Sequence, residues 1–399
     1  MENWRQYIGK QKSEYLDILL PEDLEADMIV VIPCYDETDV QTTLRSLLHC
    51  TTVGMRVMVA IVVNSGEGSK REAVLQNRKT HGELQQFADE FSNAQIRFFP
   101  LIFENLPRKH AGVGLARKMG MDLAVEYFLR KNNDRGIIVS LDADCTVSEN
   151  YFIRIAEAYG NNEKLCATVH NFRHRIENDD PHIENAARQY EHYIRYFENA
   201  LRYTGFPYDL HTIGSAFSVS ADAYVRVGGM GRQQGGEDFY FLQKIFQLGN
   251  AADLDDVFVY PMARFSERVP FGTGPALQKI IAESDGQMKV YSMQSFEWLK
   301  RFFDLKDGFF KKDRSCVERQ LSELPEPLLD FLIRNGVLSD IDDCNRNSAT
   351  WPAYRKRFFH HFNAFRIIKC LNFLHTRALP LESIASAEDK CQEKTGRNR

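Results

Sequence analysis

Residues 137–145 have the sequence IIVSLDADC, in which an apolar, mostly β-branched run ends in two acids. A run this short predicts a buried strand in a sheet that is covered on both faces. Because side chains alternate along a strand, Asp142 and Asp144 start on the same side if the extended backbone continues that far. Two carboxylates this close raise each other's pKa unless a cation lies near them.

These two acids have two interpretations. Carboxylate oxygens at the end of a parallel strand suit Mg²⁺ or Mn²⁺, and such a cation suits a diphosphate. Ligands also bind at the carboxyl ends of strands in open α/β sheets. The alternative is a strand followed by an Asp-rich turn that caps a helix. The stretch alone leaves both interpretations open.

The composition is typical of a globular protein with a substantial core. The chain has 399 residues, of which 44% are hydrophobic and 26% charged. A formal net charge of −5 argues against a general nucleic-acid binder. The 8 cysteines include no C-x-x-C pair, which favours reduced thiols over zinc or disulfides. Without a signal peptide or a long apolar run, the sequence predicts a cytoplasmic protein.

Strands and helices are expected to alternate in the first part of the chain. Strands are expected at 28–33, 56–63, 96–103 and 137–141, with helices beginning near 41, 70 and 112. Pro100 weakens the third strand. This alternation predicts a parallel, doubly wound half-sheet. A mixed region follows, and from about residue 275 the pattern is helical without a convincing strand.

Three further motifs each have a structural and a functional interpretation. VIPCYDE (31–37) is a strand-to-helix connection that could floor a nucleotide pocket. KHAGVGLARK (109–118) resembles a phosphate loop, although small residues packing on the sheet explain it as well, and it completes neither the Walker nor the dinucleotide pattern. GGEDF (235–239) places acids in a first helical turn, where the macrodipole favours them; such an acid could also serve as a general base.

Taken together and in this order, the four motifs resemble the family-two glycosyltransferases of GT-A fold over residues 28–250. The resemblance implies an α/β catalytic domain over 1–275 with a doubly wound mixed sheet. Its halves would be a Rossmann-like nucleotide-sugar-binding half (28–145) and an acceptor half (146–275). A helical C-terminal subdomain (276–384) and a disordered tail (385–399) would follow.

The resemblance also implies roles for individual residues. Asp142 would face the ribose and metal-bound water, Asp144 would ligate Mn²⁺ or Mg²⁺, and Asp238 would be the base. Glu237 would bind the acceptor. Residues implied at the nucleoside-diphosphate sugar are Pro33, Tyr35, Glu37, Asn64, Gly112, Arg117, Asp142 and Arg268.

The sequence departs from the family pattern in three places. Asn64 stands where the family usually has an acid that contacts the base, so base identity is open. Lys118 follows Arg117 where the family more often has Asn. No histidine after Asp238 has the spacing of a third metal ligand. In the segment 264–274, Arg264 or Arg268 could clamp the phosphates, or this could be an exposed basic loop.

Residues 351–377 carry six Lys or Arg and no acid, with apolar residues at roughly helical spacing. Such a helix can lie on an anionic membrane, here the inner face, which would suit a lipid-linked acceptor. A helix docked on its own domain gives the same pattern, and we favour that interpretation.

The whole pattern predicts a metal-dependent, inverting glycosyltransferase that moves a sugar from a nucleoside-diphosphate sugar to an acceptor hydroxyl. The acceptor would be a carbohydrate, a lipid-linked molecule or a small molecule. The alternatives are a nucleotidyltransferase of related fold and a non-catalytic sugar-nucleotide-binding protein.

Overall fold

The computed structural model describes residues 1–11, 18–23, 25–52, 54–177, 180–265, 272–283 and 286–396. The chain divides into two compact units. Unit 1 comprises Met1–Pro181 with Thr212–Ala276, and unit 2 comprises His182–His211 with Leu277–Arg399. Residues 182–211, which we expected in the acceptor half, therefore group with the C-terminal helices.

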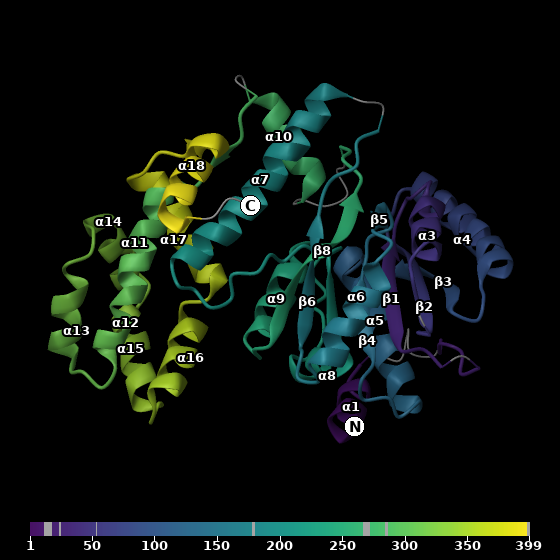
Figure 1. The fold of residues 1–399 in the computed structure, drawn as a ribbon, viewed down its shortest axis with the longest axis horizontal. Coiled ribbons are helices and arrows are strands. Elements are labelled where there is room, and N and C mark those ends of the chain that lie inside the picture. The colour runs from purple at the N-terminus through teal and green to yellow at the C-terminus, as the bar shows by residue number, and fades with distance from the viewer. Residues whose placement is uncertain are drawn as a thin grey trace. The chain divides into compact units, whose positions relative to one another are not determined.

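Unit 1 contains an eight-stranded mixed sheet of order β3-β2-β1-β4-β7-β6-β8-β5 (Figure 1). β1 to β4 form the parallel part, while β7 is antiparallel to both of its neighbours, β4 and β6. This order confirms the α/β class with a mixed sheet. The strands are β1 (Met28–Cys34), β2 (Val57–Gly66), β3 (Ile96–Leu106), β4 (Ile137–Ser140), β5 (Cys145–Val147), β6 (Ala167–Phe172), β7 (Phe217–Ser220) and β8 (Ala251–Pro261).

Helices cover both faces of the parallel strands, as their continuous apolar runs predict. Val30 and Ile32 point into a core shared with α3 (Val40–Leu48), α4 (Arg71–Phe91) and α6 (Tyr151–Asn161). The alternate residues face α5 (Val113–Arg130). There Gly120 lies so close to the sheet that a Cβ on it would be 2.4 Å from Val31 Cγ1.

Pro33 and Pro100 lie within strands of the sheet, and Pro261 is the last residue of β8. Pro100 lies in β3, which is the edge strand and therefore tolerates a residue without an N–H. Pro33 lies in β1, whose pairing with β4 ends at Val31 while its pairing with β2 continues to Cys34. Because Val31 accepts from Leu141 on the β4 side, Pro33 faces the same side beyond the last paired residue, where no ladder bond is lost.

The N-terminal helix α1 (Glu2–Ile8) anchors α5 through a buried polar network. Asp122 accepts hydrogen bonds from Tyr7 (2.6 Å), Tyr224 (2.8 Å) and Lys118 (2.8 Å). These partners satisfy a carboxylate that is fully buried. The apolar spacing of residues 1–20 predicts one helix that ends at Pro21; the structure ends α1 at Ile8, and residues 12–17 lie outside the described part.

In its described residues, unit 2 is helical apart from a two-residue antiparallel pair, β9 (Lys289–Val290) with β10 (Glu382–Ser383). Residues 384–395, expected within or beside a disordered tail, instead form α18, which buries Ile384, Ala387 and Cys391. The other helices placed wholly or partly in unit 2 are α7 (Pro181–Tyr203), α10 (Thr273–Ala282), α11 (Met293–Asp304), α12 (Lys306–Phe309), α13 (Arg314–Leu321), α14 (Glu326–Arg334), α15 (Val337–Arg346), α16 (Trp351–His361) and α17 (Ala364–Arg377).

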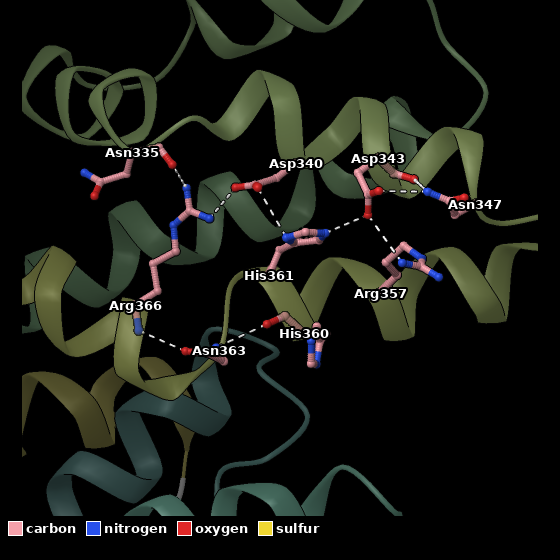
Figure 2. Close-up of polar contacts among 9 residues, drawn as sticks. All are labelled: Asn335, Asp340, Asp343, Asn347, Arg357, His360, His361, Asn363 and Arg366. Atoms are coloured by element: carbon pink, nitrogen blue, oxygen red, sulfur yellow. Dashed lines mark hydrogen bonds and ion pairs between the residues drawn. The ribbon is translucent and has the colours of Figure 1, made fainter.

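The basic segment 351–377 forms α16 and α17, and most of its apolar side chains are buried inside unit 2. Arg357 pairs with Asp343, Arg366 pairs with Asp340, and His361 lies between the same two acids (Figure 2). Part of the positive charge is therefore neutralised by α15. Burial of the apolar stripe supports the docked helix. No described helix is long and apolar enough to cross a bilayer, and contact with a membrane surface stays a prediction.

Candidate active site

Acidic side chains gather where β1 and β4 end in unit 1. β4 ends at Ser140 and the chain turns at 143–144, so the extended backbone does not persist to Asp144. Leu141, Ala143 and Cys145 nevertheless enter the core, whereas Asp142 and Asp144 are partly exposed. The two acids are thus separated from the core by the turn rather than by a continued strand.

Arg117, in the first turns of α5, connects the two acidic motifs. Its Nη2 lies 2.6 Å from Asp142 Oδ1, and its Nη1 pairs with Glu237 in α9 (Glu237–Phe246). Both Arg117 and Glu237 are only 2% exposed. Burial opposes the positive charge, but Asp142, Glu237 and Asp238 outweigh it and raise the pKa of Arg117. The structure therefore places Arg117 as a buried counter-ion, and a direct nucleotide contact stays a prediction.

The glycines before and within the first turn of α5 pack against residues 233–237. A Cβ on Gly114 would lie 2.1 Å from the carbonyl oxygen of Gln233, so only glycine fits. Gln234 Nε2 donates to the carbonyls of Arg108 (3.0 Å) and Ala111 (3.1 Å). This packing supports the small-residue interpretation of the glycine motif. A contact between Gly112 and a nucleotide stays a prediction.

Asp238 lies beside Arg117 and against the backbone of Gly214. A Cβ on Gly214 would be 2.7 Å from Asp238 Oδ2 and 3.1 Å from Arg117 Nη2, so the absence of a side chain makes room for both groups. Ser140 Oγ donates to the Gly214 carbonyl (2.6 Å), which ties this segment to β4. Burial raises the pKa of Asp238 and of Glu237, while the charge of Arg117 opposes the change. A carboxylate with a raised pKa is better suited to accept a proton near neutral pH.

Arg264 provides a second cation at the other acid of the pair. Its Nη2 lies 2.9 Å from Asp144 Oδ2 and also pairs with Glu37. Burial, Glu37 and Asp142 raise the pKa of Asp144 to about 6, and Arg264 opposes this rise. Thr80 Oγ1 donates a hydrogen bond to the backbone carbonyl of Glu37 (2.7 Å) and so fixes the backbone at that residue.

The remaining residues expected at the nucleotide are less exposed than their roles suggest. Pro33 and Asn64 are buried in β1 and β2, and Tyr35 is half-buried. The backbone carbonyl of Asn64 accepts a hydrogen bond from Asn77 Nδ2 (2.9 Å). The other side-chain atom, Asn77 Oδ1, accepts from the Asp36 N–H (2.8 Å) and so fixes the loop after β1. Their nucleotide contacts stay predictions. Arg268 lies outside the described residues.

Arg175 is a residue of this site that the sequence did not reveal. Its Nη2 lies 3.4 Å from the backbone oxygen of Asp144, and its buried Nε has no hydrogen-bond partner among the described residues. It has no carboxylate partner in the described part of the chain. Arg175 comes after β6, far from every motif in the sequence, and a single arginine in that position carries no signal.

The residues present fit a divalent cation only if the substrate supplies part of its coordination. Among the described residues, no three His, Cys, Asp or Glu side chains are grouped so as to hold a metal ion. Mg²⁺ is commonly bound by one or two carboxylates together with substrate phosphates and water. Asp142 and Asp144 match that requirement, because they are two partly exposed carboxylates just beyond the end of β4.

Asp144→Asn is expected to stabilise unit 1 by roughly 2 kcal/mol at pH 8 in the presence of a chelator. The folded-state pKa of Asp144 is raised, so its protonated form is the one that favours folding. The wild type therefore gains stability as the pH falls from about 7 to 4, and the advantage of the variant should shrink over that range. Urea unfolding at several pH values measures this difference; an advantage independent of pH contradicts the assignment.

Comparison with known proteins identifies similar solved structures but no family. No family model matches the sequence, and no curated protein matches it. The structure of S. aureus TarS 1-349 in complex with UDP-GlcNAc is similar at 12% identity and a TM-score of 0.39, covering 84% of this chain and 91% of that one. The structure of the same protein in complex with UDP is similar at 11% identity and a TM-score of 0.38, with the same coverage of both chains. Our fold assignment rests on the strand order rather than on these values.

Proposed function

We propose that this chain is a metal-dependent glycosyltransferase that moves a sugar from a nucleoside-diphosphate sugar to an acceptor hydroxyl with inversion. The observation that carries the proposal is the convergence of two acidic pairs on one buried arginine. Asp142 and Glu237, which are 95 positions apart in sequence, both bind Arg117. Arg117 therefore lies between Asp142 of the proposed donor site and Glu237, which is adjacent in sequence to the proposed base Asp238.

The residues have distinct tasks in this proposal. Asp238 accepts the proton of the acceptor hydroxyl as the new bond forms, and its raised pKa suits that task. Arg117 holds Asp142 and Glu237 in place. A cation bound at Asp142 and Asp144 would neutralise the charge of the leaving diphosphate. A base aligned with the acceptor favours direct displacement, and therefore inversion.

Two rivals fit the site less well. A nucleotidyltransferase should have a basic, glycine-rich loop directly after the first strand, whereas β1 is followed by Tyr35, Asp36 and Glu37. A non-catalytic binding protein has no need of a half-buried acid with a raised pKa such as Asp238. The acceptor could be a carbohydrate, a small molecule or a lipid-linked molecule. The last would fit a peripheral membrane contact through 351–377.

A screen of UDP-, GDP-, CDP- and dTDP-sugars by thermal shift, with and without Mn²⁺, tests the proposal. A ligand at about 100 times its Kd stabilises the folded state by about 2.7 kcal/mol. We expect one nucleotide sugar to raise the melting temperature with Mn²⁺ present, and Asp144→Ala to lose this effect. If neither nucleotide sugars nor Mn²⁺ bind the wild type, the proposal is wrong.

A further inference from the structure

Arg264 places a positive charge on two acids of the proposed donor site. One of its nitrogen atoms, Nη2, contacts both Asp144 and Glu37. The structure shows no further partner for its Nη1 or Nε among the described residues. One edge of the guanidinium thus holds the acids, and within the described part of the chain its other donors are not engaged.

The backbone next to Arg264 is anchored, which keeps its side chain within reach of Asp144 and Glu37. Met262 forms a β-bridge with Arg175, and the Ala263 N–H donates to the Arg175 carbonyl (2.9 Å). The Arg264 side chain itself is 33% exposed. It can therefore change partners by rotation of its long side chain, without disruption of the sheet edge.

A divalent cation and Arg264 must compete for Asp144. A cation ligated by Asp144 Oδ2 would stand about 2 Å from that oxygen, and the guanidinium nitrogen already lies 2.9 Å from it. Two positive groups this close repel each other in a partly buried site. A diphosphate reverses this balance, because it brings negative charge and its oxygens match the donor geometry of a guanidinium.

We propose that Arg264 is an exchangeable counter-cation: it holds Glu37 and Asp144 until a diphosphate accepts it, so that a divalent cation binds tightly only together with the diphosphate. This inference rests on the proposed function and concerns the regulation of the same site. In this scheme the divalent cation and the diphosphate bind cooperatively: each raises the affinity for the other by the same factor. Arg264 is a positioning residue in this scheme, because it acts through the acids that hold the cation.

Titration of the full chain with Mn²⁺ alone, followed by electron paramagnetic resonance, tests the inference. In Arg264→Gln we expect the affinity for Mn²⁺ to rise at least tenfold, because the competing cation is gone. In the presence of saturating UDP the gain should shrink, because UDP already displaces Arg264 in the wild type. Arg264→Lys retains a cation and should behave as the wild type does.

Arg173→Gln is the matched control. Arg173 is exposed immediately after β6, so this variant loses the same charge without touching the acids. An equal gain in Arg173→Gln, or no gain in Arg264→Gln, overturns the inference. If Arg264→Gln gains Mn²⁺ affinity but no nucleotide binds any form, the counter-cation role stands and the transferase proposal fails. If nucleotides bind with metal while Arg264→Gln gains nothing, only this inference fails.

Discussion

Replacement of Arg117 by methionine is expected to lower the free energy of unfolding of unit 1 by about 3–5 kcal/mol. The substitution leaves Glu237 buried at 2% exposure without its counter-ion, beside Asp238 and Asp142. Removing one partner of a buried ion pair costs far more than removing both, because the remaining charge has lost its water as well as its partner. Donor binding should be lost in the same variant.

The double variant Arg117→Met with Glu237→Gln separates this cause from a simple loss of packing. If the unpaired charge dominates, the second substitution should restore part of the lost stability, with a coupling of about 1–3 kcal/mol. Arg135→Met is the surface control: Arg135 pairs with Glu163, but both side chains are more than 70% exposed. Such a pair is worth about 0–1 kcal/mol.

Urea unfolding followed through Trp4 measures these differences, because Trp4 is the tryptophan of unit 1 while Trp298 and Trp351 belong to unit 2. Replacing the latter two by phenylalanine isolates the signal. A loss below 1 kcal/mol in Arg117→Met, or no recovery in the double variant, would contradict the counter-ion role.

The parallel strands were predictable because they depend on local periodicity, whereas the turn that follows β4 was not. β1, β2 and β4 are apolar on both faces, and this pattern needs no knowledge of the rest of the chain. Asp142 and Asp144 were expected on one side of the strand only if the extended backbone continued to Asp144, but β4 ends at Ser140 and the chain turns at 143–144.

The partners of these acids were not predictable, because they come from distant parts of the chain. Arg264 contacts Glu37 across 227 positions and Asp144 across 120. Arg117 drew attention as a member of a helix N-terminus that could bind phosphate. Its burial between two carboxylates depends on how α9 packs against α5, and nothing in residues 109–118 reports that packing.

The C-terminal helix α18 shows an error that the sequence could have prevented. Its polar composition suggested disorder. Yet Ile384, Ala387 and Cys391 recur at helical spacing and are buried, and Ser383 caps the helix by accepting from the Ser386 N–H. A capping serine followed by a weak apolar stripe is a helix signal even when the mean hydropathy is low.

Asp238→Asn is expected to lower transfer by about 10²–10⁴-fold while donor binding stays within a few-fold of the wild type. Asparagine retains the shape and can still accept the hydrogen bond from the Phe239 N–H (2.7 Å), but its amide cannot take up a proton at neutral pH. The measurement is release of nucleoside diphosphate, from the donor identified in the thermal-shift screen, in the presence of a panel of sugars.

Asp134→Asn, in the exposed turn before β4, is the matched control for the loss of one carboxylate. Glu237→Gln distinguishes a base from a structural acid. Glu237 pairs directly with Arg117, so its loss should weaken the fold as well as the rate, whereas Asp238→Asn should spare the fold. Full activity of Asp238→Asn would move the base elsewhere, and Glu237 could take its place only if Arg117 released it. The same experiment therefore decides whether an acid beside Arg117 takes part in sugar transfer or only supports the fold of the site.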